Sequence, residues 1–338
     1  MIVMNSLKRT IFKVDIRSLL FKILRRIFRL IIKNDSSCSL VEFPQVKGND
    51  FILAQLRKQE FNQKGFLIAK FGSYELMSLV SYLYCYKKEP KISFLQMLES
   101  TCPNLKFESN LEFLSFNAGM FPKTINEAQN LCEEYRKVLS QIDILASYEQ
   151  NELLIKKAMT HCHFVDLEAF YAPFKFDSPW TQWLEGKKVL IVHPFVESIK
   201  FQYENNRKKI FDNPLVLPEF KSLEFIKAVQ SAAGMLPEEF NSWHEALQYM
   251  KDEISKKDFD VALIGCGAYG LPLAAYVKSL GKVGIQLAGW TQMLFGIYGE
   301  RWVTQQTEYK KYINSNWIRP NKNETPYKAK GVENGCYW

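Results

Sequence analysis

Three glycines form the turn in this chain that is best suited to bind a phosphate. Gly265, Gly267 and Gly270 follow a short apolar run, residues 261–264, and precede a helical pattern that extends to about residue 280. Such a run predicts a buried parallel strand. Glycines let the main chain turn sharply and approach a ligand closely, and the unpaired N–H groups at a helix start attract anions. The spacing therefore predicts a nucleotide-binding turn.

The same glycine spacing also fits the dinucleotide fingerprint, which requires an acidic residue about 20 residues later to hold the ribose. The next predicted strand is residues 282–287. Gln286 stands near its end, Ala288 and Gly289 follow it, and none of these residues is an acid. NAD is therefore not the expected cofactor. A purely structural interpretation stays open, because glycines that only allow close strand-to-helix packing would produce the same pattern.

A second strand-to-helix turn carries Lys70, Gly72, Ser73 and Glu75, after an apolar segment at residues 65–69. Parallel sheets bind their ligands at the carboxyl ends of their strands, so this cation and this carboxylate are candidates for a ligand site. Glu75 also has a structural explanation, because an acid in the first turn of a helix interacts favourably with the helix dipole.

A third strand, residues 187–192, ends at His193 and is followed by a helix with Glu197 and Arg207. An imidazole and a carboxylate at this edge of a sheet suit general acid–base chemistry. His193 could equally form a hydrogen bond with the neighbouring backbone. Further along, a glycine-rich loop carries Gln292, Glu300 and Arg301, which could contact the hydroxyls of a ligand.

Strand patterns alternate with helical patterns from about residue 50 onward, which predicts an α/β fold with a Rossmann-like open, mostly parallel sheet and helices on both faces. We expect a linker at 35–48, the α/β domain at 49–310 and a polar tail at 311–338. The tail ends in Tyr337 and Trp338, and two aromatic side chains are costly to leave in water. We therefore expect the tail to dock on the domain.

The positive charge of the chain is confined to its first 34 residues. The whole chain has 44 basic and 36 acidic residues, a net charge of +8, and residues 1–34 alone contain nine basic residues and one acid. The remainder balances 35 basic against 35 acidic residues. This distribution excludes a globally basic nucleic-acid-binding domain, and no nucleic-acid partner is expected.

Residues 7–33 show apolar residues at helical spacing with basic residues on another face. The apolar set is Ile16, Leu20, Ile23, Ile27 and Leu30, and the basic set is Lys22, Arg25, Arg26, Arg29 and Lys33. No apolar run here can span a bilayer, and basic residues interrupt any signal-peptide core. The pattern predicts an amphipathic helix on an anionic membrane surface. Docking of this helix on the protein itself, or on a partner, is the alternative.

The seven cysteines contain no C-x-x-C pair, and there are only four histidines. Neither a disulfide framework nor a structural zinc site is expected from this set. The cysteines instead predict reduced, mostly buried thiols of a cytoplasmic protein.

Three segments of the chain resemble the bacterial glycosyltransferases of the GT-D fold, which build surface glycans such as capsular polysaccharide from nucleotide sugars. They are residues 70–75 (KFGSYE), 260–274 (DVALIGCGAYGLPLA) and 281–287 (GKVGIQL). The resemblance implies a Rossmann-like core that transfers a sugar from a nucleotide sugar to a lipid-linked or polysaccharide acceptor, on the inner face of the cytoplasmic membrane.

Glycosyl transfer requires stabilisation of a diphosphate leaving group and a base for the acceptor hydroxyl. Helix N–H groups and either Lys70 or Arg207 would stabilise the diphosphate, and three residues are candidates for the base: Glu75, His193 and Glu197. The nucleotide-sugar site implied by the resemblance comprises Lys70, Gly72, Ser73, Arg207, Gly265, Gly267, Tyr269, Gly270 and Gln292.

The chain departs from the family pattern, arginine, any residue, glycine, aspartate, any residue, glutamate, at two positions. Lys70 replaces the arginine, and Ser73 replaces the first acid of the D-x-E pair that binds Mn²⁺ or Mg²⁺ in the family. Glu75 and a hydroxyl make a poor divalent-metal site unless the diphosphate supplies further oxygens. Metal dependence therefore stays open, and Glu75 could instead act as base or orient the sugar.

Two other classes of function remain open on these residues. A nucleotide-dependent enzyme of another type, such as an oxidoreductase, would need the ribose-holding acid that the chain lacks. A non-catalytic glycan-assembly or scaffold protein would retain the fold without the chemistry, and Ser73 in place of an acid favours this alternative.

Overall fold

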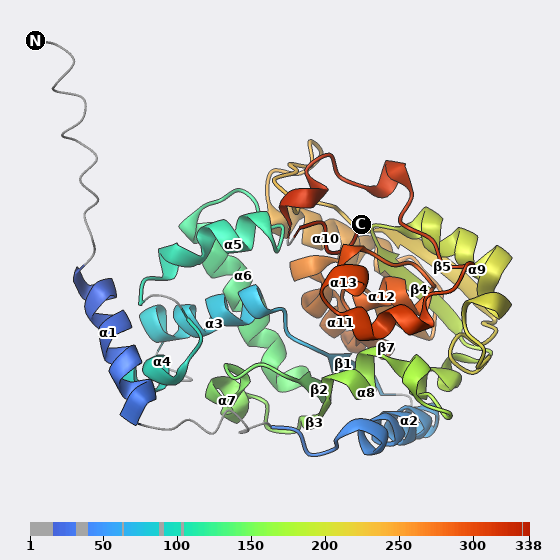
Figure 1. The fold of residues 1–338 in the computed structure, drawn as a ribbon, viewed down its shortest axis with the longest axis horizontal. Helices are drawn as coiled ribbons and strands as arrows, with labels where there is room; N and C mark the ends of the chain where they lie inside the picture. Colours follow the sequence, from blue (N-terminus) through green and yellow to red (C-terminus); the bar gives the residue numbers. More distant parts are fainter. Residues whose placement is uncertain (1–15, 32–39, 63, 88–90, 103–104, 333) are drawn as a thin grey trace, which may run out of the picture.

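The computed structural model describes residues 16–31, 40–62, 64–87, 91–102, 105–332 and 334–338 (Figure 1). Its centre is a seven-stranded, entirely parallel sheet in the order β3-β2-β1-β7-β6-β4-β5. The strands are β1 Phe66–Ala69, β2 Ile144–Ser147, β3 His163–Asp166, β4 Lys188–His193, β5 Ser222–Lys227, β6 Val261–Ile264 and β7 Val283–Gln286. The predicted open parallel α/β fold is confirmed.

The central strands are short apolar runs because both of their faces are covered. In β1, Leu67 and Ala69 belong to one hydrophobic core, while Phe66 and Ile68 belong to the core on the opposite face. The pairing register places Ile68 opposite Ile144 of β2 and Ile285 of β7. Strict burial on both sides leaves ligand-binding groups only at the ends of these strands.

Helices cover each face of the sheet. One core contains side chains of α3 Ser73–Tyr86, α4 Phe94–Glu99, α5 Leu111–Phe116, α6 Ile125–Val138, α7 Glu152–Ile155, α10 Trp243–Ser255 and α11 Gly270–Ser279. The other contains side chains of α2 Gln45–Asn62, α8 Leu167–Tyr171, α9 Val196–Ile210, α12 Trp290–Leu294 and α13 Glu300–Thr304. The remaining α-helix, α1 Ile16–Ile31, lies beside α4 at one end of the molecule, away from the sheet (Figure 1).

The folded body begins before residue 49. The main-chain N–H groups of Glu42 and Phe43 donate to the carbonyl of Phe164 at 2.8 and 3.2 Å, and Phe43 forms a parallel bridge with Val165. Helix α2 then starts at Gln45. The predicted linker, 35–48, is therefore part of the body from residue 40 onward. Its residues 35–39 lie outside the described part of the chain, as do residues 7–15 and 32–33 of the predicted amphipathic helix.

The last residues pack against the loops after β7. The main-chain N–H of Glu300 donates to the carbonyl of Trp338 at 3.0 Å, and that of Arg301 donates to Cys336 at 3.2 Å. The guanidinium of Arg319 also donates to the Trp338 carbonyl, at 2.7 Å. These bonds hold the final segment on the body at the carboxyl edge of the sheet.

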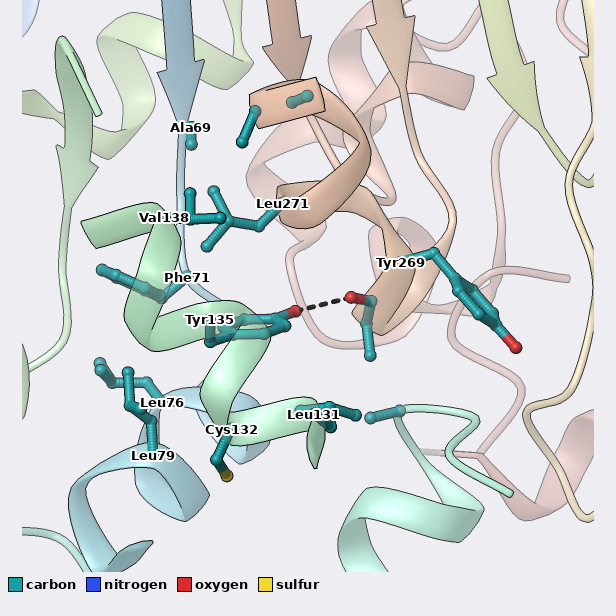
Figure 2. Close-up of a cluster of buried hydrophobic side chains, with 14 of the residues drawn as sticks. Ala69, Phe71, Leu76, Leu79, Leu131, Cys132, Tyr135, Val138, Tyr269 and Leu271 are labelled. Atoms are coloured by element: carbon teal, nitrogen blue, oxygen red, sulfur yellow. Dashed lines mark hydrogen bonds between the residues drawn. The ribbon is translucent and has the colours of Figure 1, made fainter. Parts of the chain in front are cut away.

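A cluster of buried side chains packs beside the 3₁₀ turn Gly267–Tyr269, which leads into α11 (Figure 2). Tyr135 of α6 donates its hydroxyl to the carbonyl of Ala268 at 2.9 Å. The residue four positions after Ala268 is Pro272, which has no N–H to complete the usual helical bond. Tyr135 thus supplies a donor to a carbonyl that the sequence leaves without its regular partner.

Candidate functional site

A cavity of about 350 Å³ lies over the carboxyl edge of the sheet. Because the strands are parallel, all of their carboxyl ends meet at this edge, and the segments that follow each of the seven strands contribute residues to the cavity wall. Nine of the residues predicted for the site line it: Lys70, Gly72, Ser73, Glu75, His193, Gly265, Gly267, Tyr269 and Gln292. Glu197, Arg207 and Gly270 are not among the lining residues.

Lys70 stands where β1 ends beside β7. Its main-chain N–H donates to Oε1 of Gln286 at 2.9 Å, which ties the ends of the two strands together. Its ammonium lies 5.1 Å from the ring centroid of Tyr148, the residue that follows β2, and 3.5 Å from the Tyr148 hydroxyl. Lys70 therefore places a positive charge over the junction of three strands.

Tyr148 is fixed by the same junction. Its hydroxyl donates to the carbonyl of Phe71 at 2.8 Å, and burial raises the pKa of the phenol well above its usual value. The phenol therefore stays protonated at neutral pH and supports Lys70 as a neutral group.

Glu75 is the one acid among the described residues that line the cavity, where the cations are Lys70 and Arg301. It is buried in the first turn of α3, and its carboxylate folds back toward the start of the helix, so that a Cβ added at Gly72 would lie 2.1 Å from Oε2. A side chain at position 72 would therefore displace the Glu75 carboxylate from this position. The structural role expected for Glu75 at the helix start and its place in the cavity coexist.

Ser73 faces a carboxylate that the sequence pattern does not reveal. Its hydroxyl donates to Glu149, which follows β2, and lies 3.4 Å from the hydroxyl of Tyr148. Glu149, from the segment after β2, thus lies beside Ser73 in the first turn of α3. No group of three or more His, Cys, Asp or Glu side chains suited to a metal ion occurs among the described residues. The donor set does not fit a protein-held Mn²⁺ or Mg²⁺ site.

His193 is buried at the end of β4. The main-chain N–H of Phe195 donates to its Nδ1 at 3.0 Å, which places the proton of the neutral ring on Nε2. Complete burial lowers the pKa of the imidazole to about 3. At neutral pH His193 is a neutral hydrogen-bond donor at the cavity wall. It has no nitrogen available to act as a base, because Nε2 is protonated and Nδ1 accepts the N–H of Phe195.

Close packing accounts for two glycines of the G-x-G-x-x-G segment, and backbone conformation accounts for the third. A Cβ at Gly265 would lie 2.4 Å from the carbonyl of Ala288, and one at Gly270 would lie 3.0 Å from the side chain of Gln286. Gly267 has a φ of +56°, which other residues rarely adopt. The structural interpretation of these glycines is therefore sufficient to explain their presence.

The glycine turn nevertheless reaches the cavity, because Gly265, Cys266 and Gly267 line it. Helix α11 begins without a side-chain cap, and its first N–H, that of Gly270, donates to the main-chain carbonyl of Gly267 in the 3₁₀ turn Gly267–Tyr269 that precedes the helix. Two N–H groups of that turn also have main-chain acceptors, because Ala268 donates to the carbonyl of Ala118 and Tyr269 donates to the carbonyl of Cys266, each at 3.3 Å. The positive end of α11 is thus directed to the edge on which the cavity lies.

The N–H groups at the start of α9, in contrast, are bound by a carboxylate of the protein itself. The buried carboxylate of Glu324 accepts the N–H groups of Glu197 and Ser198 at 2.8 and 3.2 Å, and also the Ser198 hydroxyl. Glu197 itself directs an exposed side chain to solvent. Arg207 lies near the far end of α9 and pairs with Glu219 at 3.0 Å. Neither residue is brought to the cavity.

Aromatic rings also line the cavity. Tyr171 stacks on Trp290 with ring centroids 3.8 Å apart, and Tyr337 and Trp338 of the final segment also line the wall. Arg301 lies 4.9 Å from the centroid of Tyr337. Gln292 donates to the Tyr337 carbonyl at 3.0 Å, so its amide group holds the final segment in place.

Several wall residues were missed by the sequence analysis, and strand-end position would have identified two of them. Tyr148 follows a strand that the apolar run 142–146 indicates, and Gln286 ends the strand after the glycine turn. Asn117, Ser231 and Trp338 come from loops and from the end of the chain. No local pattern places such segments over a sheet edge.

Comparisons of the chain with protein-family models, with curated proteins and with solved structures gave no significant match.

Proposed function

We propose that the protein is a glycosyltransferase that moves a sugar from a nucleotide-sugar donor to an acceptor hydroxyl in the biosynthesis of cell-surface glycan. The observation that carries this proposal is the composition of one cavity. It combines two cations, one carboxylate and the glycine turn before an uncapped helix, at the sheet edge where α/β folds bind nucleotides. The resemblance of residues 70–75, 260–274 and 281–287 to GT-D-fold enzymes supports the same class.

The donor diphosphate would bind between the glycine turn and the cations. The main chain of Gly265 and Gly267 approaches a ligand without side chains, and Lys70 and Arg301 supply positive charge from two other segments of the wall. Preorganised N–H groups and cations stabilise the charge that develops on a diphosphate leaving group. Arg207 has no part in this arrangement because it is bound to Glu219.

Glu75 is the base of the proposed reaction. Of the three candidate bases, Glu197 is exposed outside the cavity and His193 is neutral with Nε2 protonated. In the transfer step the bond between the anomeric carbon and the diphosphate oxygen breaks, the acceptor oxygen bonds to that carbon, and the hydroxyl proton passes to Glu75. His193 would donate a hydrogen bond from Nε2 to a donor or acceptor oxygen.

A non-catalytic scaffold is the second candidate function, and the bond between Ser73 and Glu149 favours it. Ser73 stands where the family pattern has an acid, and its hydroxyl already donates a hydrogen bond to the carboxylate of Glu149. Ser73→Asp tests this alternative: a gain of metal-dependent transfer would indicate a decayed site, whereas loss of an existing activity would show that the serine belongs to a working site.

The proposed place of action is the inner face of the cytoplasmic membrane, where lipid-linked acceptors are presented. No helix among the described residues is long and apolar enough to cross a bilayer. Any association of the described part of the chain through its helices would therefore be peripheral.

The test is calorimetric titration of the full-length protein with nucleotide sugars, free nucleotides and NAD, with and without Mn²⁺. Selective binding of one nucleotide sugar supports the proposal and identifies the donor. Lys70→Gln should weaken that binding by about tenfold or more, because a charged hydrogen bond to phosphate contributes on the order of 1.5–3 kcal/mol. Lys200→Gln is the matched control, since Lys200 is exposed on α9 outside the cavity.

Glu75→Gln separates chemistry from binding. It should retain donor binding and lose transfer, while Glu197→Gln, an acid outside the cavity wall, should retain both. Retained transfer in Glu75→Gln would remove Glu75 as the base. Binding of NAD alone would overturn the transferase proposal, and no binding across the panel would favour the scaffold.

A further inference from the structure

Helix α1 is attached to the body by one of its sides. Phe21 is 1% exposed and meets Phe94 of α4 edge to face, at 6.1 Å between centroids. One turn later, the buried guanidinium of Arg25 donates to the carbonyls of Met97 and Cys102 and to the Ser100 hydroxyl. Burial lowers the pKa of Arg25 to about 10, so the group stays charged at neutral pH. Arg25 is therefore a structural anchor and is not available to a membrane surface, contrary to its place in the expected basic face.

The other side of α1 carries six exposed aliphatic residues, which we call the α1 apolar face. They recur at the spacing of a single helical face, between 45% and 75% exposed: Leu19, Leu20, Ile23, Leu24, Ile27 and Leu30. Phe21 and Arg25 fall on the opposite side, so the apolar face points away from the body. A cluster of this kind in water indicates a binding surface.

Cations border the α1 apolar face. Exposed Lys22 and Arg26 lie along one margin and Arg17 near the other, Arg29 donates to the carbonyl of Ser100 at 3.3 Å beside Arg25, and the described helix contains no acid. A protein partner of mixed charge would not require an edge of a single sign. Anionic lipid headgroups do match it, because each basic residue near such a surface contributes about 1 kcal/mol while the apolar side chains enter the interface.

We infer that α1 binds an anionic phospholipid surface through its apolar face while the Arg25 side remains attached to α4. The helix is then an anchor with a fixed orientation relative to the α/β body. The inference deepens the proposed membrane location, and it does not depend on glycosyl transfer because α1 contributes no residue to the cavity.

The test is flotation of the full-length protein with phosphatidylcholine vesicles that contain about one third phosphatidylglycerol, at low and high salt. The variant Ile23→Ser/Ile27→Ser should lose at least tenfold in binding. Lys22→Gln/Arg26→Gln should lose about fivefold for each charge removed, and this loss should shrink at high salt. Leu236→Ser, which changes an aliphatic residue 72% exposed outside α1, is the control and should bind as the wild type does.

Sedimentation of the same variants distinguishes the lipid surface from a second copy of the chain. A dimer that dissociates in Ile23→Ser/Ile27→Ser, without vesicle binding by the wild type, would overturn the inference. Equal vesicle binding by this variant and the wild type would overturn it as well. The vesicles contain no nucleotide sugar, so failure here leaves the proposed reaction untouched, and failure of the titrations leaves this inference untouched.

Discussion

The main-chain N–H of Phe195 donates to Nδ1 of His193 at 3.0 Å, and this bond fixes the tautomer of the imidazole. With Nδ1 accepting, the neutral ring carries its proton on Nε2. Complete burial holds the pKa near 3, so the ring does not change charge between pH 5 and 8. His193 at the cavity wall is therefore a fixed donor, and a pH dependence of activity in that range would have to come from other groups.

The first prediction concerns stability at acid pH. His193 has a pKa of about 3 in the folded protein and an ordinary value of 6.5, so between these pH values the unfolded chain binds a proton that the folded chain does not. The free energy of unfolding should therefore fall as pH decreases through this window, by up to about 1.4 kcal/mol per pH unit from this group. His193→Asn keeps an acceptor for Phe195 and removes the titration. In urea unfolding from pH 7 to 4, the variant should lose less stability than the wild type; parallel curves would contradict the assigned pKa.

The second prediction concerns Glu152, whose shift has the opposite sign. Burial raises the pKa of its carboxyl to about 7, against the hydrogen bonds donated by the Ser147 hydroxyl and by the main-chain N–H groups of Tyr148 and Glu149. Between about pH 4.5 and 7 the folded chain retains a proton that the unfolded chain has lost, so the free energy of unfolding should fall as pH rises.

Glu152→Gln removes this titration and keeps an acceptor oxygen for the main-chain bonds. Its stability should gain on that of the wild type as pH rises from about 4.5 to 7. Glu185→Gln, a change at an exposed acid, is the control and should follow the wild type. A constant difference between Glu152→Gln and the wild type across this range would refute the raised pKa. The pH ranges over which His193 and Glu152 change stability overlap, and the two effects on the free energy of unfolding have opposite signs. Only the single variants therefore separate the two contributions.

The third prediction concerns the support of the glycine turn. Tyr135→Phe removes the donor to the Ala268 carbonyl and should cost about 1–3 kcal/mol, since a buried acceptor is left unsatisfied (Figure 2). Pro272→Ala restores a main-chain N–H four residues after Ala268. In that background Tyr135→Phe should cost less, as measured by a double-mutant cycle of chemical unfolding. An equal cost in both backgrounds would show that the proline does not create the need for Tyr135.

The sequence contained enough information for the fold and for the edge of the sheet at which the site lies. Buried apolar runs such as residues 261–264 predict parallel strands, and parallel strands bring Lys70, His193 and Gly265 to one edge by geometry alone. The strand order could not be predicted, because it depends on how β7 inserts between β6 and β1, and residues 70–282 lie between β1 and β7 in the chain. Order is a property of long-range packing, and no local pattern encodes it.

Two errors of placement have simple causes. A helix that follows a parallel strand runs back toward the opposite edge, so Arg207, eleven residues into α9, is carried roughly 15 Å away from the carboxyl edge. Helix direction alone could have excluded it from the site. Arg25 was assigned to a basic face by periodicity, yet the carbonyls of Met97 and Cys102 select it as a buried anchor. Periodicity identifies faces of a helix, but it does not tell which face meets protein.

The final prediction concerns Glu324, which occupies the start of α9. Its carboxylate accepts two main-chain N–H groups and the Ser198 hydroxyl, and it interacts with the positive end of the helix. Glu324→Gln directs an amide at these donors and should destabilise the protein by about 1–3 kcal/mol, with faster hydrogen exchange at residues 197–200. Glu308→Gln changes an exposed acid and should stay within about 0.5 kcal/mol of the wild type. If Glu324→Gln leaves stability unchanged and instead allows α9 to bind inorganic phosphate, the carboxylate excludes anions from this helix and contributes little to the fold.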